Sequence, residues 1–209
     1  MEKQQNVGLI ESVKVRIVHA IEGTGDVTGA MVDVVTRIVA KAIAGFGGIA
    51  TSLVHAIADV IQGTIQAVMA VGGDIGAAAK GIVVGVLRGA GDAGAANLQT
   101  ISQTAEAVIK TTARMSGDLG TAAKGLVAGA IEGAKELGLD VTQAASAAAT
   151  GALKAAGEIG SEAGDRVRGA LTGTISGVKV VLNEPFSSRS KARNHARSRR
   201  DGVEEGEPA

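Results

Sequence analysis

A block of this sequence occurs twice, with the two copies 44 residues apart. Residues 73–91 read GDIGAAAKGIVVGVLRGAG and residues 117–135 read GDLGTAAKGLVAGAIEGAK, with eleven of nineteen positions identical and three Ile/Leu exchanges. Self-similarity at a fixed period is typical of repeat proteins, in which each unit buries its apolar face against its neighbour. The repeat therefore predicts an array of similar modules.

The residues available to such an array favour helices. Pro185 and Pro208 are the only prolines, so a long Ala-rich stretch contains no strong helix breaker. Apolar residues such as Val27, Met31 and Val34 recur with the helical period. With two aromatic residues and no Cys in the chain, the core must consist of Val, Ile, Leu and Ala, and disulfides are excluded. The sequence predicts an all-α fold.

Glycine-rich breaks recur roughly every half repeat along this stretch, which is typical of helix ends. They read GTGD, GFGG, GGD, GAGDAG, SGD, LGLD and IGSE, and begin at residues 23, 45, 72, 89, 116, 137 and 159. Gly suits the left-handed position that ends a helix, and Asp or Ser caps the next one. We expect about eight helices of 15–20 residues, paired as 44-residue helical hairpins. The alternative is a few long helices with an 11-residue period that run through the glycines.

We expect two regions, a repeat domain over residues 1–183 and a tail over residues 184–209. The tail is basic and then acidic, and it lacks an apolar set that could form a core, which predicts disorder. Its cations could contact an anionic surface. These residues are Arg189, Lys191, Arg193, Arg197, Arg199 and Arg200.

Glycines also recur four residues apart inside the expected helices. A glycine in a helix interior costs about 1 kcal/mol relative to Ala, so a stripe of them requires compensation. The compensation we expect is the close approach of a second helix, either within the chain or between chains or in a membrane. The predicted helix-packing stripes consist of Gly81, Gly85, Gly89, Gly125, Gly129, Gly133, Gly169, Gly173 and Gly177.

Charged side chains form narrow polar rows at a spacing of four residues. We expect these rows to be solvated faces with weak ion pairs inside each helix. The remaining helix surface is broadly apolar, which predicts a layered or oligomeric assembly. The rows are Asp33, Arg37 and Lys41, and Glu106, Lys110 and Arg114.

No enzymatic motif emerges from the sequence. His55 and Asp59 could share a helix face, but no second histidine or HExxH motif accompanies them, so a surface hydrogen bond is expected rather than a metal site. The segment GAGDAG at 89–94 resembles a dinucleotide fingerprint in letters alone, because no β-rich run precedes it. We expect a non-catalytic protein without cofactor or metal.

The chain is not predicted to span a membrane. The most apolar stretch, residues 42–58, contains GFGG, and charges interrupt the other repeats. A helix lying on a lipid surface remains open. Residues 1–22 show no secretory signal, which predicts a cytoplasmic chain that could be peripheral to a membrane or granule.

Phrases such as GTGDVTGA, GDLGTAAKG and SAAATGALKAAGEIG resemble Gly/Ala-rich helical-repeat proteins of bacteria, some loosely termed phasin-like. The resemblance covers residues 20–183 and implies a non-catalytic role without assigning site residues. The glycine stripes and the broad apolar faces, in a sequence with few aromatic residues and no catalytic motif, predict a structural protein that self-associates as a scaffold, coat or filament subunit. The alternative is a phasin-like coat on lipid or storage granules. The expected partners are other copies of the same chain, and lipid or another anionic surface is the alternative. Nucleic acid is not expected to bind, because the net charge of the chain is zero.

Overall fold

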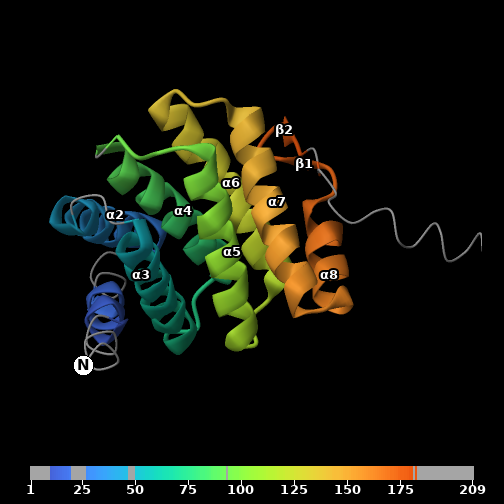
Figure 1. Ribbon diagram of the computed structural model, residues 1–209. Coiled ribbons are helices and arrows are strands. Elements are labelled where there is room, and N and C mark those ends of the chain that lie inside the picture. Colours follow the sequence, from blue (N-terminus) through green and yellow to red (C-terminus); the bar gives the residue numbers. More distant parts are fainter. Residues whose placement is uncertain (1–9, 20–26, 47–49, 93, 181, 183–209) are drawn as a thin grey trace, which may run out of the picture.

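The computed structural model describes residues 10–19, 27–46, 50–92, 94–180 and 182, and this part of the chain is almost entirely helical (Figure 1). A first helix covers residues 10–19. The remaining helices are α2 (Val27–Phe46), α3 (Ala50–Ala70), α4 (Ile75–Asp92), α5 (Leu98–Arg114), α6 (Leu119–Leu137), α7 (Val141–Ile159) and α8 (Ser161–Leu171). The predicted all-α class is confirmed. The alternative of long helices running through the glycine-rich breaks is wrong, because the helices in the described segments end there.

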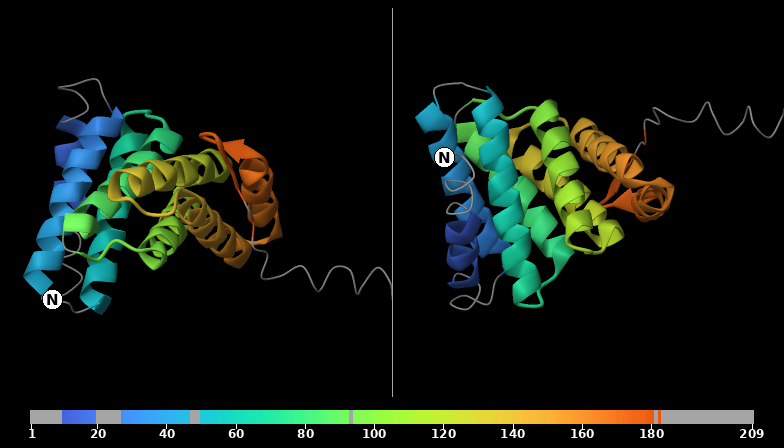
Figure 2. Two further views of the ribbon diagram at one scale, coloured as in Figure 1. Left: turned by 90° about the horizontal axis from the view of Figure 1, so that it is seen from above. Right: turned by 60° about the horizontal axis from the view of Figure 1, so that its bottom comes forward.

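The helices form two layers, in which most helices pack chiefly on the helix two positions along the chain. An even layer contains α2, α4 and α6, and an odd layer contains α3, α5 and α7, with residues 10–19 packed on α3. Within a layer the helices run in the same direction, since successive residues of one contact successive residues of the next. In both views of Figure 2 the array progresses from the blue N-terminal helices to the orange α8, which packs on α6 and α7.

The helix ends follow the predicted capping chemistry at several breaks. Gly72 and Gly138 adopt left-handed φ angles of 68° and 69°. The carboxylates of Asp118 and Asp140 accept hydrogen bonds from backbone N–H groups in the first turns of α6 and α7. These bonds satisfy donors that have no partner inside the helix. Each break therefore stops one helix and starts the next.

Three of the described breaks depart from that pattern. In IGSE, Ser161 already belongs to α8 and no side chain caps this helix, so the predicted capping role of Ser161 is wrong. In SGD, Ser116 takes the left-handed position with φ 56°, and Gly117 instead leaves room for Ile75, whose Cδ1 would lie 2.8 Å from a Cβ at this position. In GAGDAG, Asp92 still belongs to α4, and the side chain of Asn97 caps α5 by accepting a hydrogen bond from the N–H of Thr100. The predicted capping role of Asp92 is wrong.

Small aliphatic side chains fill the space between the layers. The buried positions of α7 are all Ala or Gly, while α4 and α6 add Val, Ile and Leu. Because an Ala core is thin, facing helices must lie close together for their atoms to touch. The fold consequently depends on glycine and alanine at the helix contacts.

A short antiparallel hairpin follows α8. Strand β1 (Thr174–Ile175) pairs with β2 (Val178–Lys179), and the left-handed Gly177 (φ 82°) lies in the turn between them. The prediction that this segment is helical is wrong. The predicted tail, residues 184–209, lies outside the described residues.

Candidate functional site

The first predicted glycine stripe contacts α2. A Cβ at Gly85 would lie 2.7 Å from the Cβ of Val35, and a Cβ at Gly89 would lie 2.7 Å from the carbonyl oxygen of Thr36. Gly81 has slightly more room, with the Cβ of Met31 at 3.1 Å. Only glycine permits approaches of this kind without displacement of a neighbour. The first stripe therefore packs within the chain.

The second stripe repeats the arrangement one module later, against α4. Any side chain at Gly125 would overlap the carbonyl group of Gly76, whose carbon would lie 2.8 Å from the added Cβ. A Cβ at Gly129 would lie 2.6 Å from the carbonyl oxygen of Lys80, and one at Gly133 would lie 2.6 Å from Cδ1 of Leu87. The backbones of α4 and α6 are thus in nearly direct contact.

The third predicted stripe is wrong. Because α8 ends at Leu171, Gly173 and Gly177 belong to the hairpin, with positive φ angles of 114° and 82°. Gly169 is helical, but a Cβ there would have no neighbour within 4 Å. α8 is shorter than α4 and α6, and it does not repeat their approach to the preceding even helix.

The odd layer contains a contact position that the stripe analysis missed. A Cβ at Gly63 would lie 2.8 Å from the carbonyl oxygen of Ile10, and Gly151 leaves room for the backbone of Ser102. Gly63, Ala107 and Gly151 are spaced by 44 residues, so the repeat itself carried the signal. A search for repeated glycines does not reveal this position, because its middle residue, Ala107, is not a glycine.

Ion pairs join α4 to α6 on their solvent side. The guanidinium of Arg88 donates two hydrogen bonds of 2.7 Å to Glu136, and Lys80 Nζ lies 2.7 Å from Glu132 Oε2. Hydrogen bonding to Arg88 lowers the pKa of Glu136 below its usual range, and the same bonds raise the pKa of Arg88. These pairs fix the alignment of two helices whose glycines are in contact.

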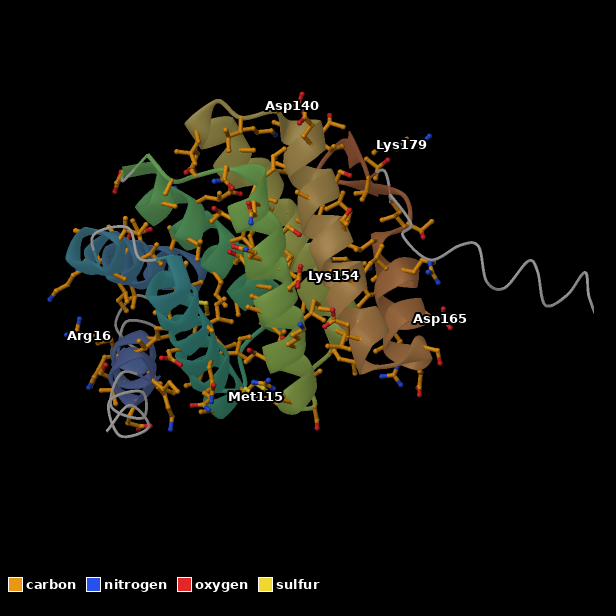
Figure 3. The ribbon with its side chains drawn as sticks, in the orientation of Figure 1. Arg16, Met115, Asp140, Lys154, Asp165 and Lys179 are labelled. Carbon is orange, nitrogen blue, oxygen red and sulfur yellow. The ribbon has the colours of Figure 1, made fainter. Side chains whose placement is uncertain are left out.

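The same arrangement links α5 to α7. Lys154 Nζ lies 3.0 Å from Glu106 Oε1, and Lys110 Nζ lies 2.7 Å from Glu158 Oε2. Figure 3 shows Lys154 where these two helices meet. The predicted polar row on α5 is therefore partly wrong, because Glu106 and Lys110 bind across helices instead of along one helix. On α2, by contrast, Asp33 and Arg37 form an exposed pair at 4.0 Å, as expected for a solvated row.

The other residues considered for chemistry do not converge on a site. The side chain of His55 lies outside the described residues, and Asp59 is half-buried on α3. GAGDAG includes the end of α4 and a left-handed Gly94, so it is a helix terminus. Within the described ranges, no cluster of three His, Cys, Asp or Glu side chains could hold a metal ion. The six basic residues from Arg189 to Arg200 fall outside those ranges.

The surface of the described part of the chain includes a larger and a smaller groove. The larger, of about 370 Å³, lies where α7 turns into α8 and is open to solvent. The smaller, of about 60 Å³, lies between α3 and α5 and is mostly apolar. The polar side chains that line the larger groove are Ser161, Glu162 and Arg166, and Arg166 forms an ion pair of 2.6 Å with Glu162.

Large apolar side chains are rarely exposed among the described residues. Val15, Val71 and Ile159 are the exceptions, and they lie on separate elements. None of the helices in this part of the chain is long and apolar enough to cross a membrane. The broad apolar faces expected from the sequence are covered by neighbouring helices of the same chain.

Comparison with known proteins gives no relative: neither a family model nor a curated protein matches this chain. The resemblance to helical-repeat proteins thus stays a sequence-based expectation.

Proposed function

We propose that the protein is a non-catalytic structural protein that acts as a helical scaffold and associates with further copies of itself. The scaffold role is supported by glycines that bring helix backbones together and by ion pairs that align the helices. Proteins built this way present an extended surface whose shape depends on the stacking of the modules.

Two exposed glycines carry the proposal of self-association. Gly157 in α7 and Gly169 in α8 lie inside helices, and a Cβ at either would have no neighbour within 4 Å. Each costs about 1 kcal/mol relative to Ala, and no neighbouring atom would crowd a Cβ at either position, as one does at the buried stripe glycines. Both lie on the last two helices of the array, where a helix of another copy could approach in the same manner.

The first test is light scattering across a hundredfold range of protein concentration. If the protein self-associates, the average mass of the particles in solution rises with protein concentration. Replacing both glycines (Gly157→Leu with Gly169→Leu) should block the approach and keep the protein monomeric. The matched control is Ala44→Leu, which adds an exposed apolar side chain on α2 at the other end of the array.

A compact monomer at every concentration would overturn self-association. Equal mass distributions for the glycine variant and the control would place any interface elsewhere. Flotation of the protein with anionic vesicles, combined with a gain of helicity, would favour the lipid-coat alternative instead.

A further inference from the structure

The odd layer is held less closely in one place than elsewhere. At the three positions spaced by 44 residues, Gly63 receives the helix over residues 10–19 and Gly151 receives α5. The middle position is Ala107, whose side chain lines the small groove between α3 and α5. Because Ala107 has a methyl group that Gly63 and Gly151 lack, α3 and α5 cannot approach each other as closely as α5 and α7 do.

That groove, here called the α3–α5 seam, is a packing defect of about 60 Å³. Atoms beside such a void lose dispersion contacts on one side, so the two helices attract each other less. The lining residues are Ile57, Ala58, Thr100, Gln103, Thr104 and Ala107.

At the repeat positions that the structure describes, the seam has no counterpart of the ion pairs that join α5 to α7. The residues of α3 that occupy the repeat positions of Glu106 and Lys110 are Gln62 and Gln66, which carry no charge. Lys110 and Lys154 of the next two helices pair with Glu158 and Glu106 across the α5–α7 contact. The α3–α5 seam therefore has neither the close approach nor the cross-helix pairs of its neighbour.

Behind the seam, the even layer stays closely packed. Gly85 and Gly89 bring α4 against Val35 and Thr36 of α2. A contact of that kind can act as a pivot, since a small rotation about it opens or closes the layer in front. Opening the seam exposes little apolar surface, because Ile57, Ala58 and Ala107 are already partly exposed.

We propose that the α3–α5 seam is a hinge: the unit formed by residues 10–19, α2 and α3 rocks against α4–α8 about the α2–α4 contact. The motion changes the curvature of the array, and with it the shape of the surface that a scaffold presents. It leaves the helices and the even layer intact. The hinge does not depend on the proposed self-association, because it concerns a single chain.

The absence of Cys makes the hinge directly measurable with spin labels on introduced cysteines. Ala70, Arg114 and Glu158 are exposed, lie near the ends of α3, α5 and α7, and are spaced by 44 residues. Ala70→Cys with Arg114→Cys reports on the seam, and Arg114→Cys with Glu158→Cys reports on the α5–α7 contact. Glu158→Cys removes one ion pair between α5 and α7. This loss can only loosen the control contact, so it works against the expected difference between the two label pairs.

Pulsed electron spin resonance then gives a distance distribution for each pair in dilute protein. We expect the seam distribution to be roughly twice as broad as the α5–α7 distribution, as for rigid-body rocking on the microsecond-to-millisecond scale. Ala107→Gly should narrow the seam distribution and leave the control pair unchanged. Ala113→Gly, an equal loss of one methyl group on α5 away from the groove lining, should narrow neither.

Equally narrow distributions for the two pairs in the unmodified background would overturn the hinge. So would an unchanged seam distribution in Ala107→Gly when circular dichroism shows that the variant keeps its helicity. Light scattering at the same dilution keeps broadening by association separate from broadening by rocking.

Discussion

The even and odd layers come from one 44-residue repeat but use it differently. In the even layer, α4 meets α2 and α6 meets α4 through three glycines each, whereas the odd-layer helices approach through one small residue each. α4 is consequently buried on most of its surface, while α5 keeps a polar face in solvent. How closely two helices approach therefore depends on the number of glycines in their contact as well as on the repeat.

The largest expected effect is in the even layer. Gly125→Ala places a methyl group against the carbonyl of Gly76, and backbone cannot give way as a flexible side chain can. We expect a loss of about 1–3 kcal/mol or more in the free energy of unfolding, measured by urea denaturation. Gly169→Ala, one repeat later, meets open space and should instead stabilise the dilute protein by about 0.5–1 kcal/mol. Similar effects of the two substitutions would refute the packing role of Gly125.

A smaller loss is expected in the odd layer, where a single position supports the contact. Gly151→Ala adds the same carbon that Ala107 carries at the seam, and it would press on the backbone of Ser102. We expect α7 to shift away from α5, with a loss of about 1–2 kcal/mol in unfolding free energy. Hydrogen exchange should speed up in α5 and α7 and stay unchanged in α2. Unchanged exchange in α7 would show that one glycine does not control the odd-layer contact.

The smallest effects concern the ion pairs. Glu136→Gln removes the negative charge and one of the two oxygens that accept hydrogen bonds from Arg88, and because the pair is partly exposed we expect a loss of only about 0.5–1 kcal/mol at neutral pH. The folded-state pKa of Glu136 is lowered, so its contribution is fully present above the pKa of the unfolded chain and is lost as the pH falls through the lower folded-state pKa. Unfolding curves from pH 7 to pH 3 should therefore converge for the two proteins at the acid end.

Lys124→Ala, on the same helix, is the control for that series because Lys124 is exposed. Its effect should stay within about 0.5 kcal/mol at every pH. If the difference between Glu136→Gln and the unmodified protein persisted at pH 3, the pair with Arg88 would not be its cause.

Much of the fold follows from local sequence. Proline-free, Ala-rich segments with helical apolar spacing predicted the helices, and glycine followed by a capping carboxylate predicted several of their ends. These features act within a few residues, so one sequence suffices to recognise them. The same locality explains the error at α8, where Gly173 and Gly177 continue the spacing of the stripe but the helix has already ended at Leu171.

The sequence alone did not identify which helix contacts each glycine stripe. The spacing of Gly81, Gly85 and Gly89 predicted that some backbone approaches them, but not that it belongs to α2 of the same chain. Likewise, Glu106 and Lys110 satisfy the four-residue spacing of an intrahelical pair. Their partners on α7 became available only when the layers brought helices from different repeats together.

The stacking of alternate helices also has a consequence for how the chain reaches its fold. During folding, Val35 of α2 must contact Gly85 of α4, although α3 lies between these two helices in the sequence. The similar glycine stripe of α6, one repeat later, is a second surface on which α2 could dock. At the repeat positions of Lys80 and Arg88, α2 has Thr36 and Ala44, which cannot neutralise Glu132 and Glu136. An α2 helix docked on α6 would leave both carboxylates without a cation. Ion pairs that add little to the final stability thereby help the folding chain to reject a slipped arrangement.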